Sequence, residues 1–361
     1  MTLRDLSEID RMATNSTRSI LIAGPSFRAI AKSLEVSFKS LGFKVSTLEW
    51  RQPPPNRMDG LRFLLSKKAS GRMQELQMFQ NALMLERVVT ELKPDIILVL
   101  KHARIAQKAR KVCDDLISKL FLWAYDSVRH IPEIAECARD FDTVFTYEPN
   151  DLEPLSKMGP TEFLPMAYDS HLYYPIVQQG PKSADILFVG ALDGYRNRRK
   201  LLELLADKLR NRQLRIWTDS ARMYSLNRIS DLLITAGRSN TGLRRQTISH
   251  ETVNKLCNDA KICLNIHRPQ SMRAVNSRNF EILGSGGFLL TDREFMCVNG
   301  ITGGEHYEAY STIGELPDRI EYFIENEEER EHLSKCGHQA VQGEHTYLHR
   351  ARRITYEAGR I

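Results

Sequence analysis

Residues 264–292 read LNIHRPQSMRAVNSRNFEILGSGGFLLTD, and this stretch decides the fold class of the chain. A largely apolar run at 262–266 leads into a polar loop. A short amphipathic segment at 276–284 then leads, through a glycine-rich turn, to a second apolar run at 288–290. This order predicts a strand, a loop, a helix, a turn and a second strand. A helix that begins between parallel strands offers free N–H groups and a positive dipole end, which favour an anion.

The side chains of this stretch suit a phosphate-bearing sugar. Arg268 and Arg278 carry guanidinium groups, which pair with phosphate oxygens, and Glu281 carries a carboxylate, which accepts hydrogen bonds from sugar hydroxyls. The stretch therefore predicts a nucleotide-sugar site.

The same stretch resembles the donor-binding signature of the spore-maturation CgeB-like glycosyltransferases, a branch of the GT-B superfamily. The family pattern is LN-h-R…N-x-R-x-F-E…G-G-hh-h-T-D, matched here by Asn265, Arg268, Asn276, Arg278, Phe280, Glu281, Gly286, Gly287 and Asp292. Further matches are Phe188-Val189-Gly190 with Arg196, Trp123-Ala124-Tyr125-Asp126, and His345-Thr346-Tyr347-x-His349-Arg350. The resemblance covers most of residues 90–355.

The resemblance implies a GT-B fold, in which two Rossmann-like domains face each other across a cleft and a C-terminal helix returns to the N-terminal domain. In the superfamily, a glutamate at the position of Glu281 accepts hydrogen bonds from the nucleotide ribose, so Glu281 is expected on an exposed cleft wall. Many retaining relatives carry another glutamate eight positions earlier, where Arg273 stands. Retention is thus the family expectation, and the sequence does not prove it. Together with their neighbours, these matches predict the donor-binding residues Gly190, Arg196, Arg199, Asn265, His267, Arg268, Asn276, Arg278, Asn279, Phe280, Glu281, Gly286 and Gly287.

The strand–helix rhythm of the two halves sets the domain boundaries. Apolar runs such as 96–100 and 119–124 alternate with amphipathic segments such as 72–92. Strands that are apolar throughout predict parallel sheets covered on both faces. The predicted parts are an N-terminal Rossmann-like acceptor domain at 1–165, a linker at 166–184, a C-terminal Rossmann-like donor domain at 185–342, and a C-terminal helix at 343–361 that packs on the N-terminal domain.

Three arginines, Arg196, Arg198 and Arg199, stand at the start of the helix that follows strand 186–189. Guanidinium groups there could neutralise a leaving diphosphate without a metal ion, or form a solvated basic face. Arg196 is the catalytic candidate, because it also matches the family pattern.

Two candidates lie in the first half. The turn from Gly24 to Ser26 either lets backbone approach the donor or is a tight strand-to-helix turn. It lacks the G-x-G-x-x-G fingerprint, so no dinucleotide cofactor is predicted. No other cofactor is predicted either. Asp126 follows a buried strand, where open α/β sheets place their ligands. Its carboxylate either activates an acceptor hydroxyl or serves as a helix cap or loop residue.

No metal is predicted. Asp140 and Asp142 form a D-x-D whose position between a helix and a strand favours turn chemistry. His345 and His349 have a metal-pair spacing but lack a clear third ligand, so packing is the better interpretation. The segment 238–245 is interpreted as a basic loop between helices, either solvated or lining the cleft.

Composition narrows the class further. The 361 residues suit two domains, and 42% hydrophobic and 27% charged residues are typical of a globular protein. The six cysteines are scattered, which predicts reduced thiols. No apolar run is long enough for a membrane helix and the N-terminus lacks a signal-peptide core, so a cytoplasmic location is expected. Peripheral membrane association stays open, because the net charge of +6 fits diphosphates, anionic lipids or nucleic acid alike.

The leading hypothesis is a metal-independent hexosyl- or related glycosyltransferase that moves a sugar from a nucleotide-sugar to an acceptor hydroxyl. The acceptor could be a glycan, a lipid-linked saccharide, a protein or a modified base. Alternatives are a non-catalytic nucleotide-sugar binding protein, a glycosyltransferase for modified nucleic-acid bases, and an epimerase or phosphorylase on the same frame. No pyridoxal-phosphate lysine stands out, which disfavours the phosphorylase, and no basic stripe with interleaved aromatics supports nucleic-acid binding.

Overall fold

The computed structural model describes residues 18–25, 29–50, 61–101, 103–178, 180–192, 195–218, 231, 234–235, 237–238, 240–269 and 273–360, with the backbone alone at 61–74 and 108. The chain divides into two compact units. The first comprises Met1–Pro165 and Tyr347–Ile361, and the second comprises Met166–Thr346. None of the described helices is both long and apolar enough to cross a membrane.

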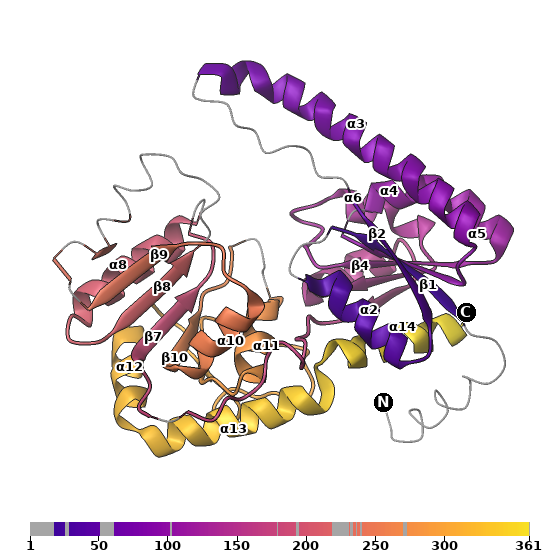
Figure 1. Cartoon of the computed structure of the whole chain (residues 1–361). Coiled ribbons are helices and arrows are strands. Elements are labelled where there is room, and N and C mark those ends of the chain that lie inside the picture. Colours follow the sequence, from indigo (N-terminus) through magenta and orange to yellow (C-terminus); the bar gives the residue numbers. More distant parts are fainter. Residues whose placement is uncertain are drawn as a thin grey trace. The chain divides into compact units, whose positions relative to one another are not determined.

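A six-stranded parallel sheet forms the centre of the first unit (Figure 1). Its strand order is β2-β1-β3-β4-β5-β6, and β1 lies between β2 and β3 in register Ile20↔Val45 and Ile20↔Ile96. β3 is buried at all five residues, as expected for a strand covered on both faces. The strands are β1 (Ser19–Gly24), β2 (Lys44–Glu49), β3 (Ile96–Leu100), β4 (Lys119–Ala124), β5 (Thr143–Thr146) and β6 (Thr161–Phe163).

Helices cover both faces of this sheet. α3 packs against α4 and α5 on one face, and α2 and α14 lie on the other (Figure 1). The core of the α3 face combines Leu85 and Val89 with the strand residues Ile97 and Leu122. The helices are α2 (Ile30–Ser40), α3 (Leu61–Leu92), α4 (Ala103–Ala106), η2 (Gln107–Ala109), α5 (Arg110–Leu116), α6 (Glu133–Cys137), η3 (Ala138–Asp140), η4 (Pro149–Asp151), α7 (Leu152–Ser156) and α14 (Tyr347–Arg360).

The C-terminal helix α14 belongs to this first unit. The ring of Tyr347 meets Trp123 of β4 edge-on, with 6.3 Å between ring centroids. Nε of Arg350 donates to the carbonyl of Pro165 (2.7 Å), and Arg353 pairs with Glu162 of β6 (2.8 Å). α14 therefore completes the core of the unit that contains β1.

The second unit also contains a six-stranded parallel sheet, with strand order β12-β11-β10-β7-β8-β9. α8, α12 and α13 contribute residues to one hydrophobic core with the strands. α11 contacts α10 and α13, and α10 also contacts β7 and β10. Its strands are β7 (Ala184–Val189), β8 (Leu214–Thr218), β9 (Thr241–Arg245), β10 (Ala260–Asn265), β11 (Leu289–Thr291) and β12 (Glu308–Ala309). Its helices are α8 (Arg196–Lys208), α10 (His250–Asn258), α11 (Ser277–Gly284), α12 (Leu316–Glu325) and α13 (Glu327–Glu344).

The prediction of a basic loop at 238–245 is wrong. Residues Thr241–Arg245 form the edge strand β9, paired in parallel with β8 along its whole length. The stretch 166–184, predicted as a linker, belongs to the second unit and lies along α10. There, the N–H groups of Tyr174 and Ile176 donate to Asn254 (3.1 Å) and Asn258 (2.7 Å).

Each sheet has one point at which the chain reverses its direction across the sheet. In the first unit this point lies between β1 and β3, and in the second it lies between β7 and β10. Open α/β sheets bind ligands beyond the carboxyl ends of the strands at such a switch point. The candidate sites are therefore next to Gly24 and Leu100 in one unit, and next to Val189 and Asn265 in the other.

Candidate functional site

A buried chain of hydrogen bonds joins the ends of β10 and β11 to the first turn of α11. Nδ2 of Asn265 donates to Oδ1 of Asn276 (3.2 Å) and to Oδ1 of Asn279 (2.6 Å). Nδ2 of Asn279 lies 3.0 Å from Nε2 of His267, and Nδ1 of His267 lies 2.6 Å from Oδ1 of Asp292. We call these five residues the asparagine–histidine network. It fixes the loop between β10 and α11.

His267 is neutral within this network. Its side chain is fully buried, and burial lowers its pKa despite the adjacent Asp292 carboxylate. Because Asp292 only accepts, Nδ1 carries the proton and Nε2 accepts from the Asn279 amide. The backbone N–H of His267 also donates to Asp292 (3.0 Å). Since Asn265, His267 and Asn279 are buried and use their polar atoms inside the unit, they hold the loop in place.

Asn276, at the end of this network, is the N-cap of α11. Its Oδ1 accepts from the backbone N–H of Arg278 (3.0 Å), so a side chain orders the first turn. The start of α11 thus lies at the carboxyl edge of the second sheet, as the sequence predicts.

The three arginines at the start of α8 have different environments. Arg198 is buried and donates to the carbonyls of Ile266 (Nε, 3.0 Å) and Ala191 (Nη1, 2.8 Å), which ties the loop after β7 to the loop after β10. Arg199 pairs with Asp231 (2.9 Å). Arg196, by contrast, is exposed at the first residue of the helix. Of the two predicted from this group, Arg196 is the one placed to meet a ligand.

The ring of Tyr195 contacts a further arginine, Arg268, beside the N-terminus of α8. The guanidinium of Arg198 lies 4.8 Å from its ring centroid, and that of Arg268 lies 5.2 Å from it. Arg268, on the loop after β10, thereby reaches the N-terminus of α8. Arg196 and Arg268 thus stand at the β7–β10 switch point, where the dipole of α8 also favours an anion. Sequence reasoning missed Tyr195, although its position directly before the arginines was a usable signal.

Glu281 was expected on an exposed wall, and this expectation is wrong. Its side chain is only 8% exposed, and its Oε2 lies 2.7 Å from Nη1 of Arg278. Burial lowers the pKa of Arg278, but the Glu281 carboxylate, Tyr173 and Cys257 together outweigh this effect, so the net pKa is raised. Tyr173 is buried nearby, with its hydroxyl 2.6 Å from Nδ1 of His250. Burial, followed by the Glu281 charge, raises the Tyr173 pKa.

Gly286 and Gly287 lie away from the N-terminus of α11. They follow the C-terminal end of α11, and its eight residues separate them from Asn276 by about 12 Å. Gly286 has a φ of +73°, and a Cβ on Gly287 would lie 3.2 Å from Sγ of Cys263. Turn geometry and close packing explain both residues. Phe280 likewise is fully buried, with its ring centroid 5.8 Å from that of Phe295, and it belongs to the core.

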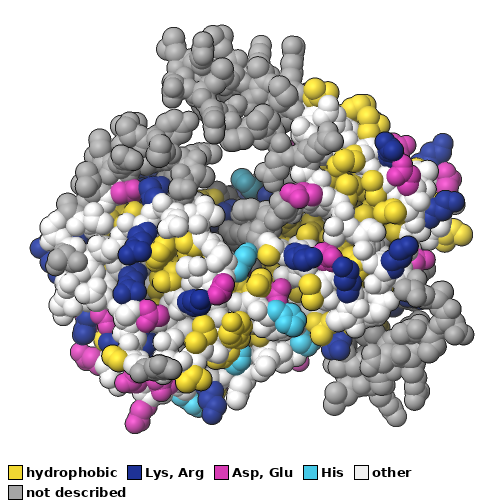
Figure 2. All heavy atoms as spheres, viewed as in Figure 1, with side chains coloured by type: hydrophobic (Ala, Val, Ile, Leu, Met, Phe, Trp, Pro, Cys, Tyr) yellow, Lys and Arg dark blue, Asp and Glu magenta, His cyan; other side chains and the backbone are white. Residues whose placement is uncertain are grey.

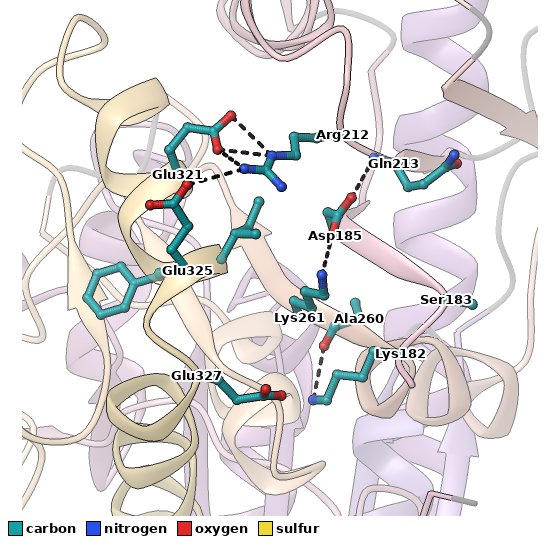
Figure 3. A network of polar contacts seen from close by, with 12 residues as sticks. Lys182, Ser183, Asp185, Arg212, Gln213, Ala260, Lys261, Glu321, Glu325 and Glu327 are labelled. Carbon is teal, nitrogen blue, oxygen red and sulfur yellow. Dashed lines mark hydrogen bonds and ion pairs between the residues drawn. The ribbon is translucent and has the colours of Figure 1, made fainter. Parts of the chain in front are cut away.

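Basic side chains at the opposite edge of the second sheet have partners of their own (Figure 3). Arg212 pairs with Glu321, and Lys261 pairs with Asp185 (2.8 Å). Lys182 donates to the carbonyl of Ala260 (3.2 Å). The cations of this edge are therefore engaged within the fold, whereas Arg196 is exposed at the carboxyl edge.

In the first unit, Gly24 and Asp126 lie at the carboxyl edge of the sheet, and Ser26 lies outside the described residues. A Cβ on Gly24 would lie 2.6 Å from Cβ of Leu100, so close strand packing already requires glycine there. Asp126 pairs through Oδ2 with Nζ of Lys101 (2.7 Å). Gly190, in the second unit, directly follows β7 and donates its N–H to the Trp217 carbonyl (3.0 Å).

Lys101 has an unusual backbone conformation. Its φ is +76°, in the left-handed region, which costs a residue with a Cβ on the order of 1–2 kcal/mol. The Lys101 and Asp126 side chains are 32% and 20% exposed, and such an ion pair contributes only about 0–1 kcal/mol. The ion pair therefore does not offset the backbone cost.

The described residues contain no group of three or more His, Cys, Asp or Glu that could hold a metal ion. Oδ2 of Asp140 accepts from Gln107 (2.8 Å), whereas Asp142 pairs with Arg110 (3.0 Å). His345 and His349 belong to different units, and burial lowers the pKa of His349 to about 4.

Residues 196–355, somewhat less than half of the chain, match the family model described as "Glycosyl transferase-like". No curated protein sequence matches the chain. The structure resembles sucrose-phosphate synthase from Thermosynechococcus elongatus (TM-score 0.66, 13% identity, covering 94% of this chain and 97% of that chain). It also resembles α,α-trehalose 6-phosphate synthase from Burkholderia multivorans (0.67, 12%, 94% and 96%) and HepE from Anabaena in complex with UDP-glucose (0.65, 12%, 93% and 98%). The chain has the GT-B fold. The predicted fold class is thereby confirmed, while the CgeB-like branch stays a prediction.

Proposed function

We propose that this protein is a glycosyltransferase that transfers a sugar from a nucleotide-sugar to an acceptor hydroxyl. The observation that carries the proposal is the cationic switch point of the second unit, where Arg196 and Arg268 lie at the N-terminus of α8 in a GT-B fold. The glycosyl transferase-like match spans this region. HepE, which shares the fold, is found in complex with UDP-glucose, so uridine diphosphate sugars are the first donors to test.

The donor diphosphate would lie between the N-termini of α8 and α11. Arg196 and Arg268 would stabilise the negative charge that develops on the departing diphosphate. Their charges are permanent, so we propose that no divalent metal is needed. The N-cap Asn276 and Arg278 would order the α11 end of this site.

Glu281 would bind the ribose with one oxygen. Its Oε2 pairs with Arg278, which leaves Oε1 to accept from a ribose hydroxyl. The Glu281–Arg278 ion pair would thus hold the carboxylate in the orientation that accepts from the ribose. In the first unit, Asp126 would orient or deprotonate the acceptor hydroxyl. Retention of the anomeric configuration remains the expectation from the family resemblance.

Two further functions use the same binding chemistry. A nucleotide-sugar sensor would bind the donor without turnover. A transferase for modified nucleic-acid bases would bind duplexes in a strongly salt-dependent way. On the face shown in Figure 2, the described Lys and Arg side chains are dispersed among Asp and Glu. This arrangement disfavours duplex binding relative to the transferase and the sensor that bind only the nucleotide-sugar.

The proposal is tested by incubating the full chain with UDP-, GDP- and ADP-sugars and an acceptor panel, and measuring nucleotide release with and without EDTA. We expect release from one donor class, increased by an acceptor and unchanged by EDTA. Binding without release would favour the sensor. Activity lost in EDTA and restored by Mg²⁺ or Mn²⁺ would contradict the metal-independent mechanism.

A further inference from the structure

Beside the switch point of the first sheet, at the carboxyl ends of β3 and β4, lies a polar pair formed by Lys101 and Asp126. Lys101 directly follows β3, and Asp126 lies two residues beyond β4, so the pair spans the ends of two neighbouring strands. Their charged atoms are 2.7 Å apart, and both side chains are partly exposed. The pair thus lies where an open α/β sheet binds its ligand.

Both partners are held by their surroundings. The N–H of Lys101 donates to the Trp123 carbonyl (3.1 Å). On the other side, the buried carboxylate of Asp151 accepts from the hydroxyl of Ser127 (3.0 Å) and the N–H of Val128 (2.8 Å). The loop that carries Asp126 is therefore ordered without help from its own carboxylate.

The choice of lysine at this position is not explained by stability. A glycine adopts a φ of +76° without the penalty that a Cβ incurs, and the partly exposed ion pair returns little. A second lysine, Lys93, also has a positive φ (+47°), but it lies just after α3, before β3 begins. The two lysines therefore share a backbone strain and differ in their position at the sheet.

We propose that Lys101 and Asp126 form the acceptor subsite and bind adjacent hydroxyl groups of a saccharide. The ammonium group donates a hydrogen bond to one hydroxyl, and the carboxylate accepts one from its neighbour. Because the pair carries no net charge, it matches a neutral polyol better than an anion. This assignment rests on the proposed function and names the acceptor class for it.

The probe is methyl α-D-glucopyranoside, observed by saturation-transfer difference NMR on the full chain. We expect binding to the unaltered protein and to the control Lys93→Gly, and at least a fivefold weaker signal with Lys101→Gly and Asp126→Asn. Both glycine variants should melt at or above the temperature of the unaltered protein. Lys101→Met keeps the backbone strain and removes only the ammonium group, so it should lose binding with an unchanged melting temperature.

The outcomes separate this inference from the proposed function. Glucoside binding that depends on Lys101, in a protein that turns over no nucleotide-sugar, would support the subsite and overturn the transferase. Turnover with equal glucoside binding in Lys101→Met would overturn the subsite alone. A failure of the unaltered protein to bind the glucoside, or its displacement by inorganic phosphate, would overturn the neutral saccharide as the ligand class.

Discussion

The two switch points of this molecule are built differently. In the second unit, the asparagine–histidine network (Asn265, His267, Asn276, Asn279 and Asp292) fixes the loop that carries Arg268. In the first unit, the strand ends carry one partly exposed ion pair, Lys101 with Asp126, and no net charge results from it. The same parallel-sheet geometry thus yields a cationic site in one unit and a neutral polar site in the other. The difference teaches that side chains at the strand ends, rather than the fold, distinguish the proposed donor site from the proposed acceptor site.

The largest effect is expected when the network of the second unit loses its carboxylate. Asp292→Ala leaves the backbone N–H and Nδ1 of His267 without an acceptor inside the unit. Buried unsatisfied donors each cost roughly 1–3 kcal/mol, so the free energy of unfolding should fall by about 2–4 kcal/mol. Urea denaturation measures this change. Asp292→Asn, which retains an acceptor oxygen, should lose less. A change below about 0.5 kcal/mol in Asp292→Ala would show that the network is not what orders the loop.

A somewhat smaller effect is expected at Glu281. Glu281→Ala removes the partner of the partly buried Arg278 guanidinium, so the apo protein should lose about 1–3 kcal/mol of stability as well as donor affinity. Glu281→Gln keeps an acceptor oxygen and should lose less of both. Thermal unfolding without ligand and calorimetry with UDP measure the two effects separately. An unchanged apo melting temperature in Glu281→Ala would contradict the observed burial and restore the interpretation of an exposed ribose ligand.

A third comparison concerns one histidine in each unit, the partly buried His349 and the fully buried His267. Burial lowers the pKa of His349 in the first unit to about 4, and it also lowers the pKa of His267 in the second unit. Below a pH of roughly 6.5, these histidines bind protons in the unfolded chain but not in the folded protein. Stability should therefore be full above that pH and should decline as the pH falls towards 4. His349→Gln should reduce this decline, measured as urea midpoints between pH 7 and 4, while the exposed His332→Gln should not. Equal slopes in the two variants would contradict the burial effect at His349.

The sequence predicted the β10–α11–β11 region closely, because apolar runs mark the strands and Asn276 marks the helix start. The position of Gly286 and Gly287 after the end of α11 also agrees with the predicted glycine-rich turn. The exposure of Glu281 was predicted wrongly. Its carboxylate is buried beside Arg278, and the distant residue Tyr173 comes within electrostatic range of it only in the folded unit. Local pattern cannot supply such long-range information.

Edge strands and the first-unit site were harder to predict for another reason. β9 reads TGLRR, with one apolar residue in five, because an edge strand of this kind is only partly buried. It therefore lacks the hydrophobic signal on which strand prediction depends. Lys101 gave no signal either, since its positive φ and its contact with Asp126 are visible only in the structure. The hydrophobic runs predicted the architecture, whereas the long-range polar pairs that define the sites required the fold.

The central claim is that the switch point of the second unit binds the donor diphosphate through Arg268 and Arg196. Calorimetric titration of UDP into the unaltered protein and Arg268→Ala tests it most directly, with Arg212→Ala as the matched control at the opposite edge of the sheet. We expect Arg268→Ala to bind at least about tenfold more weakly, since a charge-assisted hydrogen bond contributes roughly 1.5–3 kcal/mol, and Arg212→Ala to bind normally. If UDP does not bind, the same titrations are repeated with GDP and ADP. Equal affinity of the unaltered protein and Arg268→Ala for the nucleotide that binds, or no binding of any of the three, would contradict the account.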